Sequence, residues 1–149
     1  VLSNPKIEKD VKNDAHLFIA RAALQTADVS RARAAYKEVE KSATGELAAE
    51  ALYYNAYFIH ESGEYKASNE VIQKLAKEYS GYRLYGAKGL VLMAKNFYAL
   101  KDAYQATYIL ESVITNFSEL QDVVAEAKTT LQKIKAEESK TNSSIQTDQ

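Results

Sequence analysis

Cysteine and tryptophan are absent from the 149 residues, and proline occurs only once. Without cysteine, the chain has no disulfides, no thiolate metal ligands and no cysteine nucleophile. The formal net charge of −1 leaves no excess of basic side chains for binding nucleic acid phosphates. Lys6, Lys9 and Lys12 alternate with Glu8 and Asp10, which indicates a solvated helix face rather than a basic patch.

Long apolar runs are also missing, since no stretch approaches the roughly 20 apolar residues that a transmembrane helix needs. Hydrophobic residues nevertheless make up 46% of the chain, which is enough for one domain with a continuous core and too much for intrinsic disorder. The first three residues, Val-Leu-Ser, read like the end of a helix. We therefore expect residues 1–4 to be the end of a truncated upstream repeat of a longer protein.

A pattern that recurs along the chain is the most informative feature present. Residues 15–43, 49–82 and 87–117 each combine an apolar helix pattern, a short polar turn, an alanine soon after the turn, and a second apolar helix pattern. A period of roughly 35–39 residues is typical of helical solenoids, in which each repeat buries its apolar face against the next. The sequence therefore predicts an all-α fold built from helix pairs.

Apolar spacing and turn residues predict seven helices. Asn4 is a candidate N-cap with Pro5 at the first helical position, and Asp28 is a candidate cap for the second helix. The expected helices cover about 5–26, the segment from Asp28 to Thr44, and about 46–61, 64–79, 82–100, 103–117 and 122–137.

The last of these helices is expected to close the fold. Its predicted inward positions are Val124, Ala127, Leu131 and Ile134, and its opposite side is polar, as a terminal cap requires. Residues 5–138 would then form the helical repeat domain. Residues 139–149 are rich in Ser, Thr, Asn and Gln, and we expect them to form a mobile tail.

Small residues come into register when the turns are aligned. They are Ala32, Ala67 and Ala106 after the turns, and Ala20, Asn55 and Ala94 before them. This layout resembles the tetratricopeptide repeat (TPR) over roughly residues 5–138. The resemblance implies a right-handed α-solenoid of about three TPR-like helix-turn-helix repeats plus a C-terminal capping helix. Two departures are Asn55, at a close helix crossing, and the absence of the proline usual at repeat ends.

Residues 63–80 and 101–117 are similar to repeats of bacterial envelope proteins, namely the periplasmic coordinator of the Tol-Pal system and the outer-membrane assembly lipoprotein of the Bam system. Residues 123–138 are similar to the closing helix of that group. The resemblance implies the C-terminal repeats of a large Bacteroidetes-type envelope protein. It implies a periplasmic or outer-membrane-associated location and leaves a cytoplasmic one open.

In TPR proteins the first helix of each pair lines a concave surface, so the resemblance nominates partner-binding residues here. These groove candidates are Arg21, Gln25, Tyr57, His60, Lys88, Lys95 and Tyr98. The basic members would suit a peptide carboxylate or an acidic segment. The alternative interpretation is that the charges are ordinary solvated side chains and that the tyrosines pack in the core.

Catalytic and metal-binding patterns are missing from the sequence. His16 and His60 lie on different predicted helices, without the paired spacing of a zinc-binding helix. No glycine-rich phosphate loop and no nucleophile with its base can be identified. We therefore expect no enzyme activity, no cofactor and no metal.

The leading hypothesis is a protein–protein interaction scaffold that binds a partner protein or peptide, without nucleic acid and without direct insertion into a membrane. One alternative is a structural spacer or self-association segment of a longer solenoid, and another is a small-ligand or glycan-binding module that uses tyrosines. We also expect the apolar side of residues 7–22 to seek a partner, for instance in a homodimer.

Overall fold

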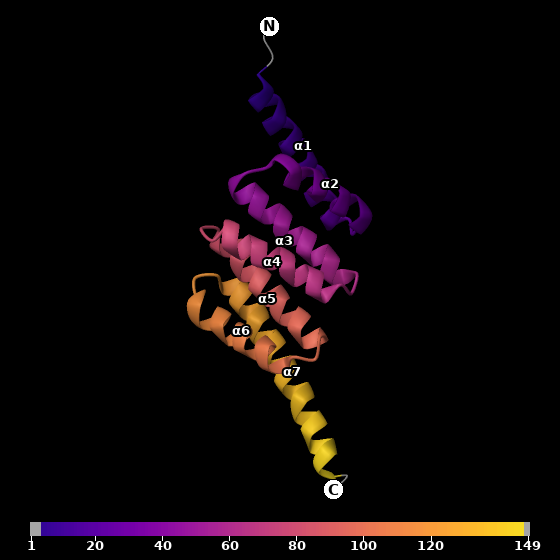
Figure 1. The fold of residues 1–149 in the computed structure, drawn as a ribbon, viewed down its shortest axis with the longest axis vertical. Coiled ribbons are helices and arrows are strands. Elements are labelled where there is room, and N and C mark those ends of the chain that lie inside the picture. Colours follow the sequence, from indigo (N-terminus) through magenta and orange to yellow (C-terminus); the bar gives the residue numbers. More distant parts are fainter. Residues whose placement is uncertain (1–3, 148–149) are drawn as a thin grey trace.

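The computed structural model describes residues 4–147 and contains, over that range, seven α-helices and no β-strand (Figure 1). The helices are α1 (Pro5–Gln25), α2 (Val29–Ser42), α3 (Gly45–Glu61), α4 (Tyr65–Glu78), α5 (Arg83–Ala99), α6 (Ala103–Asn116) and α7 (Gln121–Thr147). The predicted all-α class is confirmed. Residues 1–3, predicted as the end of an upstream helix, lie outside the described residues. Within the described part, no helix combines the length and apolar character needed to cross a membrane.

Local chemistry explains where several helices begin. The Asn4 side chain accepts a hydrogen bond from the Lys6 backbone N–H at 3.0 Å, and Pro5 occupies the first turn, where a missing N–H costs nothing. Asp28 caps α2 and Asp102 caps α6 in the same way, through backbone N–H groups three residues further on. The N-caps predicted from the sequence at Asn4 and Asp28 are therefore confirmed.

The same turn joins the two helices of each pair. A residue with positive φ stands at each turn: Ala27 (59°), Gly63 (80°) and Lys101 (69°). The N–H of the following residue reaches back to a carbonyl five residues earlier, in the pairs Asp28–Ala23, Glu64–Ile59 and Asp102–Phe97. This is the Schellman arrangement of a helix C-terminus. The turns are 36 and 38 residues apart, which defines the register between the helix pairs.

This register corrects two alignments made from the sequence. Ala56, and not Asn55, is equivalent to Ala20 and Ala94, and all three alanines are fully buried. Likewise Ser68, and not Ala67, holds the small-residue position after the turn. A serine is accommodated there because its hydroxyl donates to the Ala56 carbonyl at 2.8 Å. The close crossing of α3 and α4 therefore uses small residues, like the other pairs.

The helices pack in succession. Each contacts the next one along the chain, and in addition α3 contacts α5 and α5 contacts α7. Figure 1 shows them following one another along the long axis, from α1 at one end to α7 at the other. One core cluster joins α1, α2 and α3, another joins α5, α6 and α7, and smaller clusters lie between them. Because α3, α5 and α7 are neighbours, residues from all three can share one surface.

The seventh helix differs most from its prediction. It continues to Thr147, ten residues beyond the predicted end, because residues 138–147 contain no glycine or proline to interrupt it. The prediction of Val124 as an inward residue is wrong by one position, since Val123 is the buried valine at 3% exposure. Residues 139–146 are exposed, and Figure 1 shows this end of α7 projecting beyond the other helices. The mobility of the tail stays a prediction.

Candidate functional site

The seven residues predicted to line a groove fall into separate places. Arg21 and Gln25 are on α1, while the other five are on α3 and α5. The α1 pair lines a hollow of about 510 Å³ together with Asp14, Leu17, Phe18 and Ala22, all from the same helix. This hollow is therefore distinct from any surface that α3 and α5 share.

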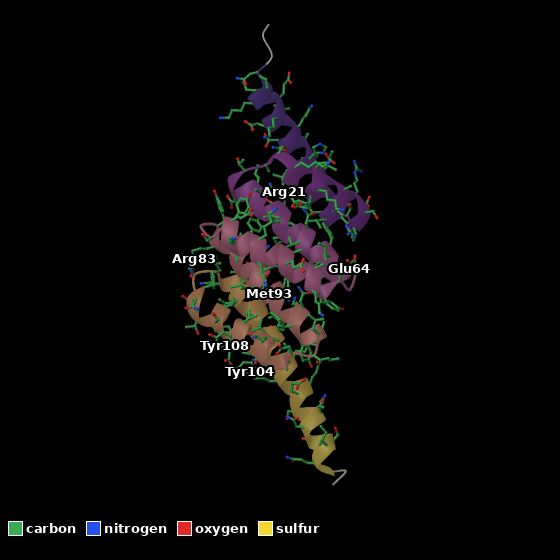
Figure 2. The ribbon with its side chains drawn as sticks, viewed as in Figure 1. Arg21, Glu64, Arg83, Met93, Tyr104 and Tyr108 are labelled. Carbon is green, nitrogen blue, oxygen red and sulfur yellow. The ribbon has the colours of Figure 1, made fainter. Side chains whose placement is uncertain are left out.

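Arg21 is held by a carboxylate of its own chain. Its guanidinium donates two hydrogen bonds to Glu50, at 3.0 and 2.7 Å, and the Tyr36 hydroxyl donates a third at 2.9 Å. Glu50 is only 3% exposed. Burial on its own raises the pKa of Glu50, but the hydrogen bonds from Arg21 and Tyr36 outweigh it and hold the pKa below its ordinary value. Arg21 thus joins α1 to α3, in the region where Figure 2 labels it, and its charge is already balanced.

Lys88 and Tyr57 are also engaged internally. The Lys88 ammonium lies 5.4 Å from the ring centroid of Tyr53 and 5.7 Å from that of Tyr85, which are cation–π distances. Burial raises the pKa of both tyrosines, so their hydroxyls stay neutral. Tyr57 is half-buried and packs edge-on against Phe58 at 5.6 Å. Both predicted residues therefore contribute packing between α3 and its neighbours.

His60 ends a buried chain of hydrogen bonds that fixes its protonation pattern. Both amide hydrogens of Asn96 are donated, to the Ser68 hydroxyl and to Asn69 Oδ1, each at 2.9 Å. Asn96 Oδ1 must therefore accept, and it lies 2.7 Å from His60 Nδ1. Nδ1 is therefore the ring nitrogen that donates to Asn96, and in the Nδ1–H tautomer Nε2 is the nitrogen available to accept a hydrogen bond. Nε2 is 3.9 Å from a Glu61 carboxylate oxygen, beyond hydrogen-bond range.

A second hollow, of about 420 Å³, opens where α3, α5 and α7 meet. Its lining residues are His60, Lys95, Tyr98, Thr129, Thr130, Lys133 and Ile134. Three of the seven predicted residues are thus brought together here, each from the C-terminal half of its helix. The remaining lining comes from α7, which the sequence interpretation treated only as a cap.

Charges around this hollow are partly paired. The Lys95 ammonium contacts Glu126 at 2.7 Å. The Tyr98 hydroxyl donates to Glu137 at 2.6 Å, and this hydrogen bond raises the pKa of Tyr98 to about 12. Lys133, in contrast, makes no ion pair with any described residue. The hollow therefore offers an acceptor nitrogen from His60, hydroxyls, one available ammonium and an apolar floor at Ile134.

The hollow combines hydrogen-bonding groups with an apolar contact. Among the described residues, no group of three or more His, Asp or Glu side chains could hold a metal ion. The polar groups are mixed donors and acceptors around an apolar contact, which is the pattern of a recognition site. Such a site could accept a polar side chain or the backbone of an extended peptide.

Apolar residues of the first helices pack in the core, since Leu17, Leu52, Ala56 and Val91 are 6% exposed or less. Sequence reasoning did not identify Glu50 and Asn96 as residues that organise the site. Both are polar residues at positions where the helical period expects apolar ones, and that mismatch was the available signal.

The chain matches no model of a known protein family, and the search of curated proteins returned no match. The likeness to TPR proteins therefore rests on the residues of the repeat itself.

Proposed function

We propose that the chain is a right-handed α-solenoid of the TPR type, with three helix pairs and α7 as the first helix after them. The three equivalent turns support this, as do the buried alanines at positions 20, 56 and 94. In that arrangement α1, α3, α5 and α7 are the first helices, and the contacts of α5 with α3 and α7 make these three helices one continuous surface.

On that basis, we propose that the protein is a non-enzymatic scaffold that binds an extended peptide segment of a partner protein. The observation that carries this proposal is the hollow in which His60, Lys95 and Tyr98 meet α7. Its depth comes from three neighbouring helices and its polar groups are held in place, since Asn96 orients His60 and Glu126 orients Lys95. Preorganised groups bind without losing side-chain freedom at that moment.

The chemistry of the hollow favours a segment with a carboxylate or amide group. Lys133 can donate to a carboxylate, and Nε2 of His60 can accept from an amide or hydroxyl. The resemblance to Tol-Pal and Bam repeats makes a cell-envelope assembly partner in the periplasm the proposed context, with the cytoplasm as the alternative.

Selection of peptides from a random displayed library against the immobilised protein would test this. Bound peptides should lose at least about tenfold in affinity, measured by fluorescence anisotropy, on His60→Ala or Lys133→Glu. The matched control is Lys128→Glu, which makes the same charge change on α7 at an exposed residue outside the hollow. Peptides that bind all variants equally would place recognition elsewhere, and a selection that yields no peptide would refute the proposal.

A structural spacer is the second candidate, and one observation favours it. Arg21, Lys88 and Lys95 were the cations predicted to meet a ligand, and each is instead engaged by a side chain of its own chain. A surface occupied in this way can serve to hold successive helix pairs together. The absence of selectable peptides, together with strong destabilisation by substitutions at these cations, would favour the spacer.

A further inference from the structure

The outer face of α1 is apolar and uncovered. Ile7 and Val11 are each 60% exposed and Phe18 is 75% exposed, and the three lie on one side of the helix. Figure 1 shows α1 at the end of the row of helices, with α2 on one side only. No other described helix exposes three large apolar side chains in such a stripe.

The molecule contains three internal precedents for what covers this face. Shifting Val11, Ala15, Phe18 and Ala22 by the 36- and 38-residue spacing of the turns gives the equivalent positions on the later first helices. They are Leu47, Ala51, Tyr54 and Phe58 on α3, and Tyr85, Gly89, Leu92 and Asn96 on α5. The C-cap residues of α4 and α6, Tyr79 and Phe117, are also 38 residues apart, and this step gives Val123, Ala127, Thr130 and Ile134 on α7.

On α3, α5 and α7 these positions face the preceding second helix. Tyr54 stacks on Tyr36 of α2 at 4.6 Å between ring centroids. Leu92 packs against Ile72 of α4. Val123, Ala127 and Ile134 share a core cluster with Leu110 and Val113 of α6. The exposed face of α1 is therefore an interface of a kind that the molecule forms three times elsewhere.

The small residue in each set explains how the helices approach. A Cβ atom on Gly89 would lie 3.2 Å from Ile72 Cγ2 and 3.3 Å from Leu75 Cδ2, so large side chains of the preceding helix rest directly on this position. Ala51 and Ala127, at the equivalent places, are fully buried. Ala15 is the corresponding small residue of α1, and it is exposed.

We propose that a second copy of this chain covers the face, with the two α1 helices packed antiparallel about a two-fold axis. The face is complementary to itself, because it carries large side chains, Phe18 and Val11, and small ones, Ala15 and Ala22. In an antiparallel pair, Phe18 of one copy lies over the partner's Ala15, and Val11 lies over the partner's Ala22. A two-fold interface uses the same patch on both copies.

The C-terminal end of the row is unsuited to the same role, which is why the contact is symmetric rather than head-to-tail. The side of α7 that points away from α6 exposes Lys128 and Gln132. Desolvating these polar groups against Phe18 would be unfavourable. The dimer is distinct from the peptide hollow on α3, α5 and α7, so either proposal can fail without the other.

Sedimentation velocity of the full chain from about 1 to about 500 µM tests the dimer. We expect a monomer–dimer equilibrium in the wild type and at least a hundredfold weaker association in Phe18→Glu. Tyr104→Glu is the matched control, because Tyr104 is an equally exposed aromatic residue at 78% on the remote helix α6, and it should dimerise like the wild type (Figure 2). Circular dichroism should show both variants folded.

Cross-linking supplies a second readout, since the chain has no cysteine of its own. Ala15→Cys should form a covalent dimer with a short bis-maleimide, while Tyr104→Cys should not. A wild type that is monomeric at the highest concentration would overturn the proposal. Dimerisation that survives Phe18→Glu, or that is lost in Tyr104→Glu, would overturn it equally by placing the interface elsewhere.

Discussion

Glu50 is the residue at which three helices converge, since it lies on α3 and accepts hydrogen bonds from Arg21 of α1 and Tyr36 of α2. A carboxylate at 3% exposure is tolerable only because these donors satisfy it. The Glu50→Gln substitution keeps the shape of the side chain but removes its charge. It also places an amide N–H donor opposite a donor of Arg21 or Tyr36. We expect a loss of about 1–3 kcal/mol in the free energy of unfolding, measured with urea.

The expected loss is kept modest because the Arg21 side chain is 55% exposed and can regain water. Glu38→Gln is the matched control, because it removes the same charge from an exposed pair with Lys41. It should change stability very little. An equal effect of the two substitutions on the free energy of unfolding would mean that the buried Glu50 network stabilises the protein no more than an exposed ion pair does.

The same network predicts how stability depends on pH. The folded-state pKa of Glu50 lies below its ordinary value of 4.5, so the stabilisation is complete above pH 4.5 and is lost as the pH falls through the folded pKa. The difference in unfolding free energy between wild type and Glu50→Gln should therefore be constant from about pH 5 to 8 and shrink below 4.5. A difference that grows on acidification would mean that burial dominates and that the folded pKa is raised.

At the scale of the element, the three turns offer a direct test of backbone strain. Ala27 and Lys101 adopt positive φ, which glycine accepts at no steric cost, whereas Gly63 already meets the requirement. Ala27→Gly and Lys101→Gly should each stabilise the protein by up to about 1 kcal/mol. Gly63→Ala should destabilise it by a similar amount. Stabilisation by Gly63→Ala in chemical denaturation would contradict the proposed equivalence of the turns.

Substitutions at two glycines of α5 measure the effect of helix propensity and the effect of packing separately. A Cβ atom at Gly86 meets nothing within 4 Å, so Gly86→Ala should stabilise the helix by about 0.5–1 kcal/mol. At Gly89 the tips of Ile72 and Leu75 leave no room, and both are buried. Gly89→Val should therefore cost about 1–3 kcal/mol through overpacking. Thermal unfolding of both variants would test these two stability changes. A Gly89→Val variant as stable as the wild type would show that α4 and α5 can move apart.

Helix existence and most helix ends could be predicted from the sequence, because apolar spacing and capping residues act within one turn. The register between helix pairs could not be predicted reliably. Counting back from Ala67 led to Asn55, whereas the Ser68 hydroxyl bond to Ala56 lets a polar residue occupy the small-residue position. The continuation of α7 was missed because polar composition was taken as the end of the helix.

At the scale of the whole molecule, the sequence could nominate residues of the site but could not predict which side chains pair with them. His60, Lys95 and Tyr98 could be nominated from helix position, and they do line one hollow. The pairing of Arg21 with Glu50, 29 residues away, and of Lys95 with Glu126, 31 residues away, depends on how the helix pairs stack. Such pairings depend on how the helix pairs are aligned in space. That alignment is determined by many residues together and not by any local sequence pattern.

The linear succession of contacts also predicts a gradient of local stability. The pair α5–α6 has neighbours on both sides, in α4 and α7, whereas α1 has a helix on one side only. Opening a terminal unit disrupts fewer contacts than opening a central one. In hydrogen exchange at a concentration that keeps the protein monomeric, amides of α1 should therefore exchange at least about tenfold faster than those of α5, and those of residues 139–146 faster still.

Raising the protein concentration then tests whether the two α1 helices pair, as proposed, or whether α1 is only the exposed end of the row of helices. If two copies pair through α1, protection should increase selectively over residues 11–22 by mass action, while residues 139–146 stay unchanged. Equal protection of α1 and α5 in the dilute protein would contradict the gradient. A concentration-dependent gain spread evenly over all helices would instead mean that association stabilises the molecule globally, without a preferred face.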